Sequence, residues 1–246
     1  MIKRLAPDLN AFTCHFDPLI LQNIYSSYAT KVKKQLDDSL PLNWHQGGTD
    51  IFKSLKGSEG DYFVASYGTN PLMWVSCDSE PTYRLYEKFF GDLCIQDELK
   101  TLIDYDKSLR VYCGFLVVGR QADKPIWHVD YKAGAQAQTL ITPLLPPDPK
   151  HGNLMYRDAT GVCRTYHYRF GEAIFFGDGF LHSTQPYTAT EENRVLLSLT
   201  FGSDKDDHWN CIEKTVGTQS RYLAYPDGSW RYNRLLASEP SLAYAN

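Results

Sequence analysis

Four residues in the second half of the chain have types and spacings that could hold a metal ion and an anion. His128 and Asp130 are two residues apart, so in a strand their side chains lie on the same face. A Gly-rich turn ahead of His182 supplies a second imidazole, and Arg194 follows twelve residues later, before the apolar run 195–201. Two imidazoles and one carboxylate on one face, with other coordination positions open, suit non-haem ferrous iron. We therefore expect the fold to bring His128, Asp130 and His182 together.

The sequence between residues 110 and 202 is typical of a β-structure. Short apolar runs alternate with turn signals such as Gly119, Gly134 and Gly171, and no helical pattern lies between them. We expect strands at 110–118, 126–131, 137–145, 153–157, 162–169, 172–176 and 194–202. Short strands at this spacing favour an antiparallel sandwich or barrel, and the His-x-Asp pair should lie at the end of one of them.

The flanking regions follow a different pattern. Helical periodicity predicts amphipathic helices at 17–37, 81–93 and 96–105, with strands at 62–67 and 72–75. Residues 1–16 and 41–61 are expected to be irregular, and a short helix is expected near 216–224. We interpret 1–246 as a single domain, made of a helical and mixed N-terminal elaboration (1–109), a core (110–202) and a C-terminal extension or lid (203–246).

Composition and charge argue against several classes of partner. The net charge is -4, and Lys and Arg are scattered, so no surface suited to nucleic acid is expected. No apolar run approaches the ~20 residues that a membrane-spanning helix needs, and the N-terminus lacks the apolar core of a signal peptide. The six cysteines are widely spaced without a CxxC pair, which predicts a reduced, cytoplasmic protein with Cys113 and Cys163 as small core residues.

The motif residues resemble those of the Fe(II)- and 2-oxoglutarate-dependent dioxygenases. The resemblance rests on the His-x-Asp pair at His128 and Asp130, on the distal His182 and on Arg194, and it covers roughly residues 110–202. It implies a mainly β fold with flanking helices around a double-stranded β-helix (jelly-roll) core. It also implies that the two histidines and Asp130 bind Fe(II), that 2-oxoglutarate chelates the metal through its keto acid, and that Arg194 holds the distal carboxylate. The family uses O2 as its oxidant.

Three further residues are compared with this family. Tyr112, sixteen residues before His128, resembles in placement a strand tyrosine that helps to bind the cosubstrate in some relatives. Some relatives carry an Arg-x-Ser pattern; here Leu196 stands at the serine position, and Ser198, two residues later on the same strand face, is a candidate replacement. Halogenases of this type lack the carboxylate ligand. Because this chain keeps Asp130, the resemblance favours hydroxylation or another oxidation over halogenation.

The resemblance implies an oxygenase that oxidises a small molecule, with hydroxylation favoured, and releases succinate and CO2. Two alternatives stay open: the same chemistry on a peptide or protein side chain, and a cupin-like metal-binding module without catalysis. Each residue also has a structural interpretation: a structural His-Asp pair, a turn histidine at His182, a buried aromatic at Tyr112, and a surface arginine paired with Glu191 or Glu192. Segments 43–60, 132–136 and the tail after 203 are candidates to cover the pocket. No motif identifies the substrate or the oligomeric state.

Overall fold

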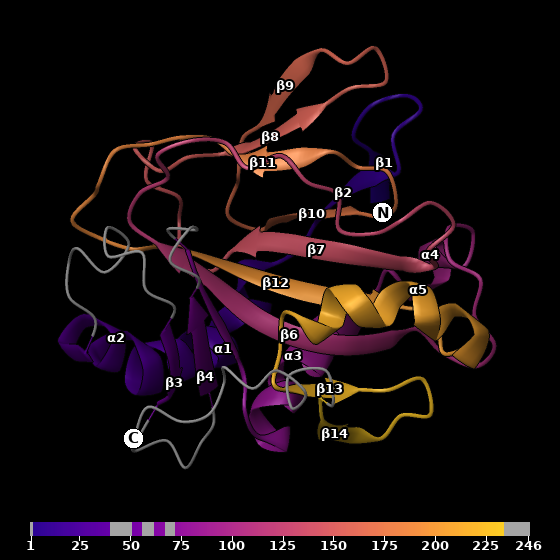
Figure 1. Cartoon of the computed structure of the whole chain (residues 1–246), viewed down its shortest axis with the longest axis horizontal. Coiled ribbons are helices and arrows are strands. Elements are labelled where there is room, and N and C mark those ends of the chain that lie inside the picture. Colours follow the sequence, from indigo (N-terminus) through magenta and orange to yellow (C-terminus); the bar gives the residue numbers. More distant parts are fainter. Residues whose placement is uncertain (1, 40–50, 56–61, 67–71, 234–246) are drawn as a thin grey trace.

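The fold is built on two antiparallel sheets (Figure 1). The computed structural model describes residues 2–39, 51–55, 62–66 and 72–233. Within these ranges the large sheet has nine strands, in the order β1 (Ile2–Arg4), β2 (Ala11–His15), β10 (Glu172–Phe176), β7 (Ala137–Pro143), β12 (Arg194–Gly202), β6 (Arg110–Gly119), β5 (Met73–Cys77), β4 (Tyr62–Ser66) and β3 (Ile51–Ser54). Neighbouring strands are antiparallel throughout.

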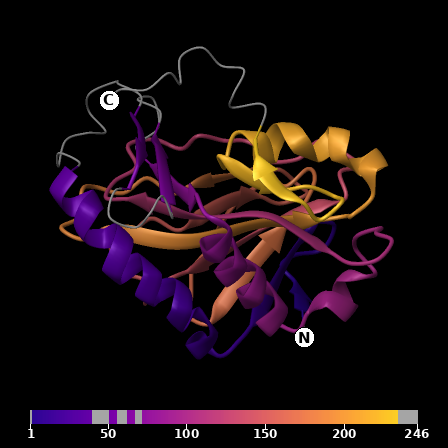
Figure 2. The ribbon, with the colours of Figure 1, turned by 90° about the horizontal axis from the view of Figure 1, so that it is seen from below.

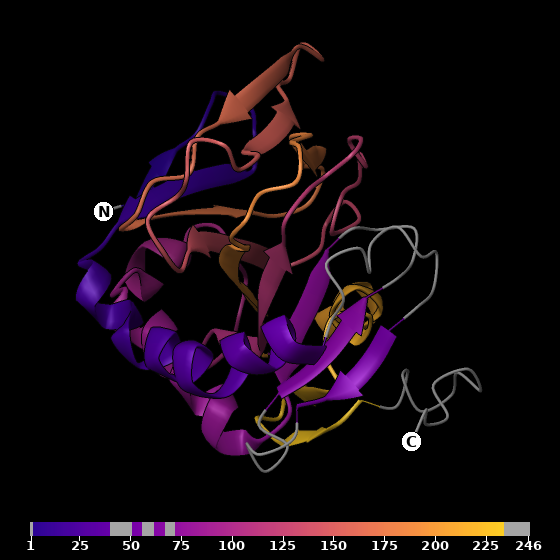
Figure 3. The ribbon, with the colours of Figure 1, turned by 90° about the vertical axis from the view of Figure 1, so that its left-hand side faces the viewer.

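The small sheet lies across one end of the large one. It contains β11 (His182–Thr184), β8 (Leu154–Arg157) and β9 (Cys163–Tyr166), in that order and again antiparallel. A bridge between His128 and His182 adds the segment around His128 to its edge. In Figure 3 the β8–β9 hairpin and the helical layer lie at opposite ends, with strands of the large sheet between them. The prediction of a mainly β fold with a jelly-roll core is confirmed.

Strand β12 shows how the sequence builds the core. All nine of its residues are buried, because both faces of the strand are covered. One face carries Val195, Leu197, Leu199 and Phe201, which pack against the helices. The other face carries Arg194, Leu196, Ser198 and Thr200. The strand alternation therefore places the arginine and the serine on the inner face of the jelly roll, which is the face that the small sheet covers.

Helices cover both faces of the large sheet. A continuous helical stretch, made of η1 (Pro18–Leu21), α1 (Gln22–Ser27), η2 (Tyr28–Lys33) and α2 (Lys34–Ser39), packs with α3 (Glu80–Asp92) on the outer face. The short α4 (Gln96–Leu99) follows α3. Helix α5 (Asp206–Gly217) lies on the opposite face, as Figure 2 shows, beside the hairpin of β13 (Tyr222–Ala224) and β14 (Trp230–Tyr232). The inner face is thus covered by the small sheet at one end and by α5 at the other.

Several local predictions are wrong. Residues 1–16 are not irregular, because β2 pairs with β10 and β1 pairs with β2, so both strands extend the large sheet. Part of the expected 41–61 loop is β3, and the rest of that segment lies largely outside the described residues. The C-terminal helix is α5, ahead of the predicted 216–224, where β13 stands instead. Only a single bridge forms within the strand expected at 126–131. The assignment of 1–246 to one domain stays a prediction.

The cysteines differ in burial. All six cysteines are free thiols. Cys113 is buried as predicted, but Cys163 is exposed, because β9 pairs only with β8 and three of its four residues face solvent. Within the described part of the chain, no helix combines the length and hydropathy needed to cross a membrane.

Gly114 of β6 lets α3 approach the sheet closely. A Cβ atom at this position would lie 2.3 Å from Cδ1 of Tyr86, a side chain that is fully buried. We expect Gly114→Ala to lower the free energy of unfolding by about 1–3 kcal/mol, the usual cost of overpacking a core. Gly91→Ala is the matched control: Gly91 lies in α3, and no atom comes within 4 Å of the methyl group that alanine would add. This control should be neutral or stabilising by up to ~1 kcal/mol. Urea denaturation of both variants measures the difference, and equal stabilities would contradict this packing.

Candidate metal centre

Two neighbouring segments present the three candidate ligands. The main-chain N–H of His128 donates to the carbonyl of His182 at 3.0 Å, and the N–H of His182 donates back to the carbonyl of His128 at 3.0 Å. Residues that exchange both bonds lie directly opposite each other, so their side chains project to the same side. Asp130 lies two residues after His128, and its carboxylate reaches the same space. The backbone pairing thus brings together the residues that the sequence separates.

The donor atoms of the triad converge. One ligand atom from each of His128, Asp130 and His182 lies within 4.8 Å of the others, the one such cluster of His, Cys, Asp or Glu among the described residues. Oδ1 of Asp130 is 3.6 Å from Nε2 of His128 and 3.8 Å from Nε2 of His182. These distances fit three ligands around a single divalent ion, each of which binds at about 2.0–2.2 Å.

Main-chain carbonyls orient both imidazoles. Nδ1 of His128 lies 2.9 Å from the carbonyl oxygen of Ile126, and Nδ1 of His182 lies 3.0 Å from that of Phe180. A carbonyl can only accept, so each Nδ1 carries the proton and each Nε2 offers a lone pair to the shared space. Hydrogen bonds of this kind fix the ring orientation of metal-ligating histidines.

The two histidines have different environments. His182 is 5% exposed and its ring lies 4.5 Å from that of Phe176, whereas the side chain of His128 is 51% exposed. Burial lowers the pKa of His182, and the nearby Asp130 carboxylate opposes this only in part. His182 is therefore neutral near pH 7, which is the form that binds a metal. The exposure of His128 leaves one side of the triad open to solvent.

Arg194 is a buried cation with free donors. It is 4% exposed, and its Nη1 donates to the carbonyl of Gly152 at 2.7 Å, while its guanidinium carbon lies 5.2 Å from the ring centre of Tyr187. Its Nε and Nη2 are buried and have no hydrogen-bond partner among the described residues. A buried donor without a partner is costly, and a planar guanidinium matches a carboxylate through two parallel bonds. Arg194 therefore fits an anion, and it is not the surface residue of the structural interpretation.

Ser198 and Tyr112, the other two residues proposed to bind the cosubstrate, lie in different surroundings from each other. Ser198 is 1% exposed and lies on the same strand face as Arg194. Tyr112 is fully buried, and its hydroxyl donates to the carbonyl of Ser203 at 2.6 Å, while its ring packs against Trp209 under α5. The structure thus gives the Tyr112 hydroxyl a partner in the C-terminal extension, and a role in cosubstrate binding stays a prediction for both residues.

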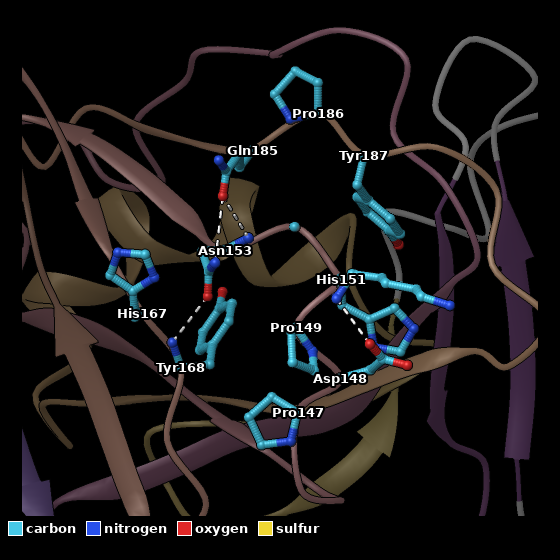
Figure 4. A pocket seen from close by; sticks show the side chains of 12 residues that line it. Pro147, Asp148, Pro149, His151, Asn153, His167, Tyr168, Gln185, Pro186 and Tyr187 are labelled. Atoms are coloured by element: carbon cyan, nitrogen blue, oxygen red, sulfur yellow. Dashed lines mark hydrogen bonds between the residues drawn. The ribbon is translucent and has the colours of Figure 1, made fainter.

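A hollow of about 520 Å³ is lined in part by residues that contact Arg194 (Figure 4). Gly152 and Tyr187 line it, and both also contact Arg194. Asn153, also in the lining, accepts from the main-chain N–H of Tyr168, and its own main-chain N–H donates to Oε1 of Gln185. No triad residue is in its lining. The hollow therefore lies next to residues that contact Arg194, and no motif in the sequence had indicated it.

Two threonines that the sequence did not single out contact Asp130. Thr139 of β7 donates to Oδ2 of Asp130 at 2.6 Å, and Thr215 of α5 donates to the main-chain carbonyl of Asp130.

Of the predicted lid segments, 43–60 is described only at 51–55, and the tail is described to residue 233. The loop 132–136 is held by Gly134, whose N–H donates to Asp178 at 2.7 Å.

The comparisons with known proteins concern the fold. No family model and no curated protein matches the chain. Among solved structures, AviO1 from Streptomyces viridochromogenes Tue57 aligns with a TM-score of 0.52 and 13% identity, over 79% of this chain and 90% of that chain. EctD from S. alaskensis, in its apoform, aligns with a TM-score of 0.51 and 11% identity, over 83% of this chain and 84% of that chain. These two alignments show a shared fold.

Other solved structures align at slightly lower TM-scores. A prolyl-4-hydroxylase from Pseudomonas putida has a TM-score of 0.48 and 13% identity, over 80% of this chain and 94% of that chain. HygX from Streptomyces hygroscopicus, with nickel and 2-oxoglutarate bound, has a TM-score of 0.48 and 11% identity, over 79% of this chain and 83% of that chain. The chain has a double-stranded β-helix fold. This fold carries the converging His-Asp-His triad, and through these residues the sequence resembles the Fe(II)- and 2-oxoglutarate-dependent dioxygenases.

Proposed function

We propose that this protein is an Fe(II)- and 2-oxoglutarate-dependent oxygenase that oxidises a small-molecule substrate, with release of succinate and CO2. The observation that carries the proposal is the convergence of His128, Asp130 and His182, with both Nε2 lone pairs and one carboxylate oxygen directed at one point. Two imidazoles and one carboxylate with an open side are the ligand set of non-haem iron oxygenases. Iron bound there would supply the chemistry by which O2 oxidises the substrate while 2-oxoglutarate is consumed.

The residues of the chain have distinct roles in this proposal. His182 forms the buried side of the site and stays neutral, so that it does not have to lose a proton to bind metal. His128 forms the exposed side, which leaves room for a substrate to approach. Arg194 holds the distal carboxylate of 2-oxoglutarate, and its unpartnered Nε and Nη2 support this assignment. Ser198 and Tyr112 are weaker candidates for the same cosubstrate.

Hydroxylation is the proposed outcome. The chain keeps Asp130 as the third ligand, so a halide is not given a free protein-ligand position. The donor set does not select iron alone, because imidazole and carboxylate ligands also accept nickel, cobalt and zinc. Purified protein can therefore carry another first-row metal, and activity has to be measured after the metal has been removed and Fe(II) added.

The test is a substrate screen with Fe(II), 2-oxoglutarate and O2, read as succinate formed above the uncoupled background. A small molecule that raises succinate formation and is itself recovered with one added oxygen atom would support the proposal. Stimulation only by peptides would assign the same chemistry to a side-chain hydroxylase. Metal binding by the triad with no 2-oxoglutarate turnover, coupled or uncoupled, would make the protein a cupin-like metal-binding module instead.

A further inference from the structure

Asp130 accepts hydrogen bonds from the side chains of two threonines. Oδ1 of Asp130 faces the two imidazoles, Oδ2 accepts from the hydroxyl of Thr139, and the main-chain carbonyl accepts from the hydroxyl of Thr215. The two threonines come from different parts of the chain, one from the centre of the large sheet and one from the C-terminal helix. Both are side-chain hydrogen bonds outside the strand ladders and outside the hydrogen bonds within helices.

Thr139 is a rigid donor. It is 3% exposed on β7, opposite Phe176 on one neighbouring strand and Thr200 on the other. Its hydroxyl has one proton, which goes to Oδ2 of Asp130 at 2.6 Å. The buried hydroxyl of Tyr131 lies 3.3 Å from the hydroxyl of Thr139, at hydrogen-bond distance. This chain of hydroxyls selects which carboxylate oxygen turns to the sheet and which one turns to the imidazoles.

Thr215 links the metal centre to the C-terminal extension. Ile212 and Val216 of the same helix are fully buried, in a cluster with Phe115 and Tyr131, and this packing fixes the position of α5 on the inner face of the sheet. Residues three and four apart share a helix face, so Thr215 sits next to this anchored stripe. From there its hydroxyl reaches the carbonyl of Asp130. In Figure 1 the helix lies in front of β6 and β12.

We infer that Thr139 and Thr215 are positioning residues for the metal, acting through Asp130; the inference rests on the proposed metal centre. Thr139 fixes the rotation of the carboxylate, and Thr215 fixes the main chain from which it projects. Without them Asp130 can turn Oδ1 away from the imidazoles, and metal binding then has to restore its orientation at a cost in free energy. Partners of this kind, which hold a ligand without touching the metal, change metal affinity by about 10–100-fold in other sites. The segment after residue 203 is then part of the metal centre and not only a cover.

The experiment measures Co(II) affinity of the full-length, metal-free protein by titration. Thr139→Val and Thr215→Val remove each hydroxyl at nearly constant shape, and each should raise the Kd for Co(II) by about 10–100-fold. Thr139→Ser and Thr215→Ser keep the hydroxyl and should bind within a few-fold of the wild type. Thr142→Val is the matched control, because Thr142 is also buried on β7 and its hydroxyl bonds a main-chain carbonyl, that of Glu172. It should leave the Kd unchanged.

A second variant separates positioning from stability. Thr215→Ala favours the helix, since Ala has the higher helix propensity, and yet should weaken Co(II) binding as Thr215→Val does. The visible absorption of the Co(II)-saturated protein should also change in Thr139→Val, where Oδ2 is released, and not in Thr142→Val. If the wild type shows no Co(II) binding that depends on Asp130, the proposed metal centre itself fails. If the wild type binds through Asp130 and the Val and Ala variants bind equally well, the positioning inference is overturned.

Discussion

Replacing Asp130 with Ala should reduce the affinity for Fe(II) or Co(II) by at least about 100-fold and abolish 2-oxoglutarate turnover. The carboxylate is the one anionic donor in the triad, and it lies within 4 Å of both Nε2 atoms. Changes to residues that merely support a metal ligand cost about 10–100-fold, so loss of a ligand should reach or exceed the upper end of that range. The measurement is a metal titration of metal-free protein, followed by succinate formation at saturating 2-oxoglutarate.

The control for this variant is Asp97→Ala. The side chain of Asp97 is 91% exposed and pairs with Lys100, so its loss removes one negative charge without touching the site. It should bind metal as the wild type does. Metal binding by Asp130→Ala that equals this control would mean that the three side chains converge for a structural reason, as a hydrogen-bonded His-Asp-His group.

Replacing Arg194 with Ala should raise the 2-oxoglutarate concentration needed for turnover by at least ~30-fold. Truncating one partner of a buried, charge-assisted pair costs about 2–5 kcal/mol, which corresponds to roughly 30- to several-thousand-fold in affinity. Arg194→Lys keeps the charge but loses the planar guanidinium. The 2-oxoglutarate concentration that this variant needs should therefore lie between those of the wild type and Arg194→Ala. Metal affinity should stay nearly intact in both variants, because none of the hydrogen bonds or ring contacts of Arg194 reaches a triad residue.

A monocarboxylic keto acid serves as the internal control for the arginine. Pyruvate has no distal carboxylate, so in the wild type it gains nothing from Arg194. In Arg194→Ala its disadvantage relative to 2-oxoglutarate should largely disappear, because the dicarboxylic acid would now bury an unpaired charge. Turnover against the concentration of each keto acid measures this. Equal 2-oxoglutarate dependence in Arg194→Ala and the wild type would place the cosubstrate anchor elsewhere.

The sequence was sufficient for the parts of the site that follow a local period. Strand alternation predicted that His128 and Asp130 would share a side, and their ligand atoms do converge although only a single bridge forms there. The inward direction of Arg194 follows from its place at the head of an apolar strand. The register that sets His182 opposite His128 could not be read, because it depends on pairing between segments that are far apart in the chain. Sequence alone could therefore name the candidate ligands but not the bonds that bring them together.

Several other features of the structure could not be predicted from the sequence, because they too depend on contacts between distant segments. Strands β1 and β2 are short; β2 pairs with β10, a strand from the second half of the chain, and β1 pairs with β2. In helix α5 only Ile212, Val216 and Gly217 are buried, so few apolar positions mark where the helix begins. Thr139 and Thr215 went unnoticed because threonine is common in strands and helices, and only the tertiary contact with Asp130 distinguishes them.

The order of strands in the large sheet also governs when the site can form during synthesis. Its central strand, β12, is the last of the nine to leave the ribosome, and it separates β7 from β6. Pairings that span so much of the chain give a high contact order, and such sheets fold slowly. The growing chain therefore exposes unpaired β6 and β7 edges until residue 202 has emerged, which makes nascent protein prone to aggregation. Chains released before residue 215 would carry all three proposed metal ligands and still lack one of the contacts to Asp130.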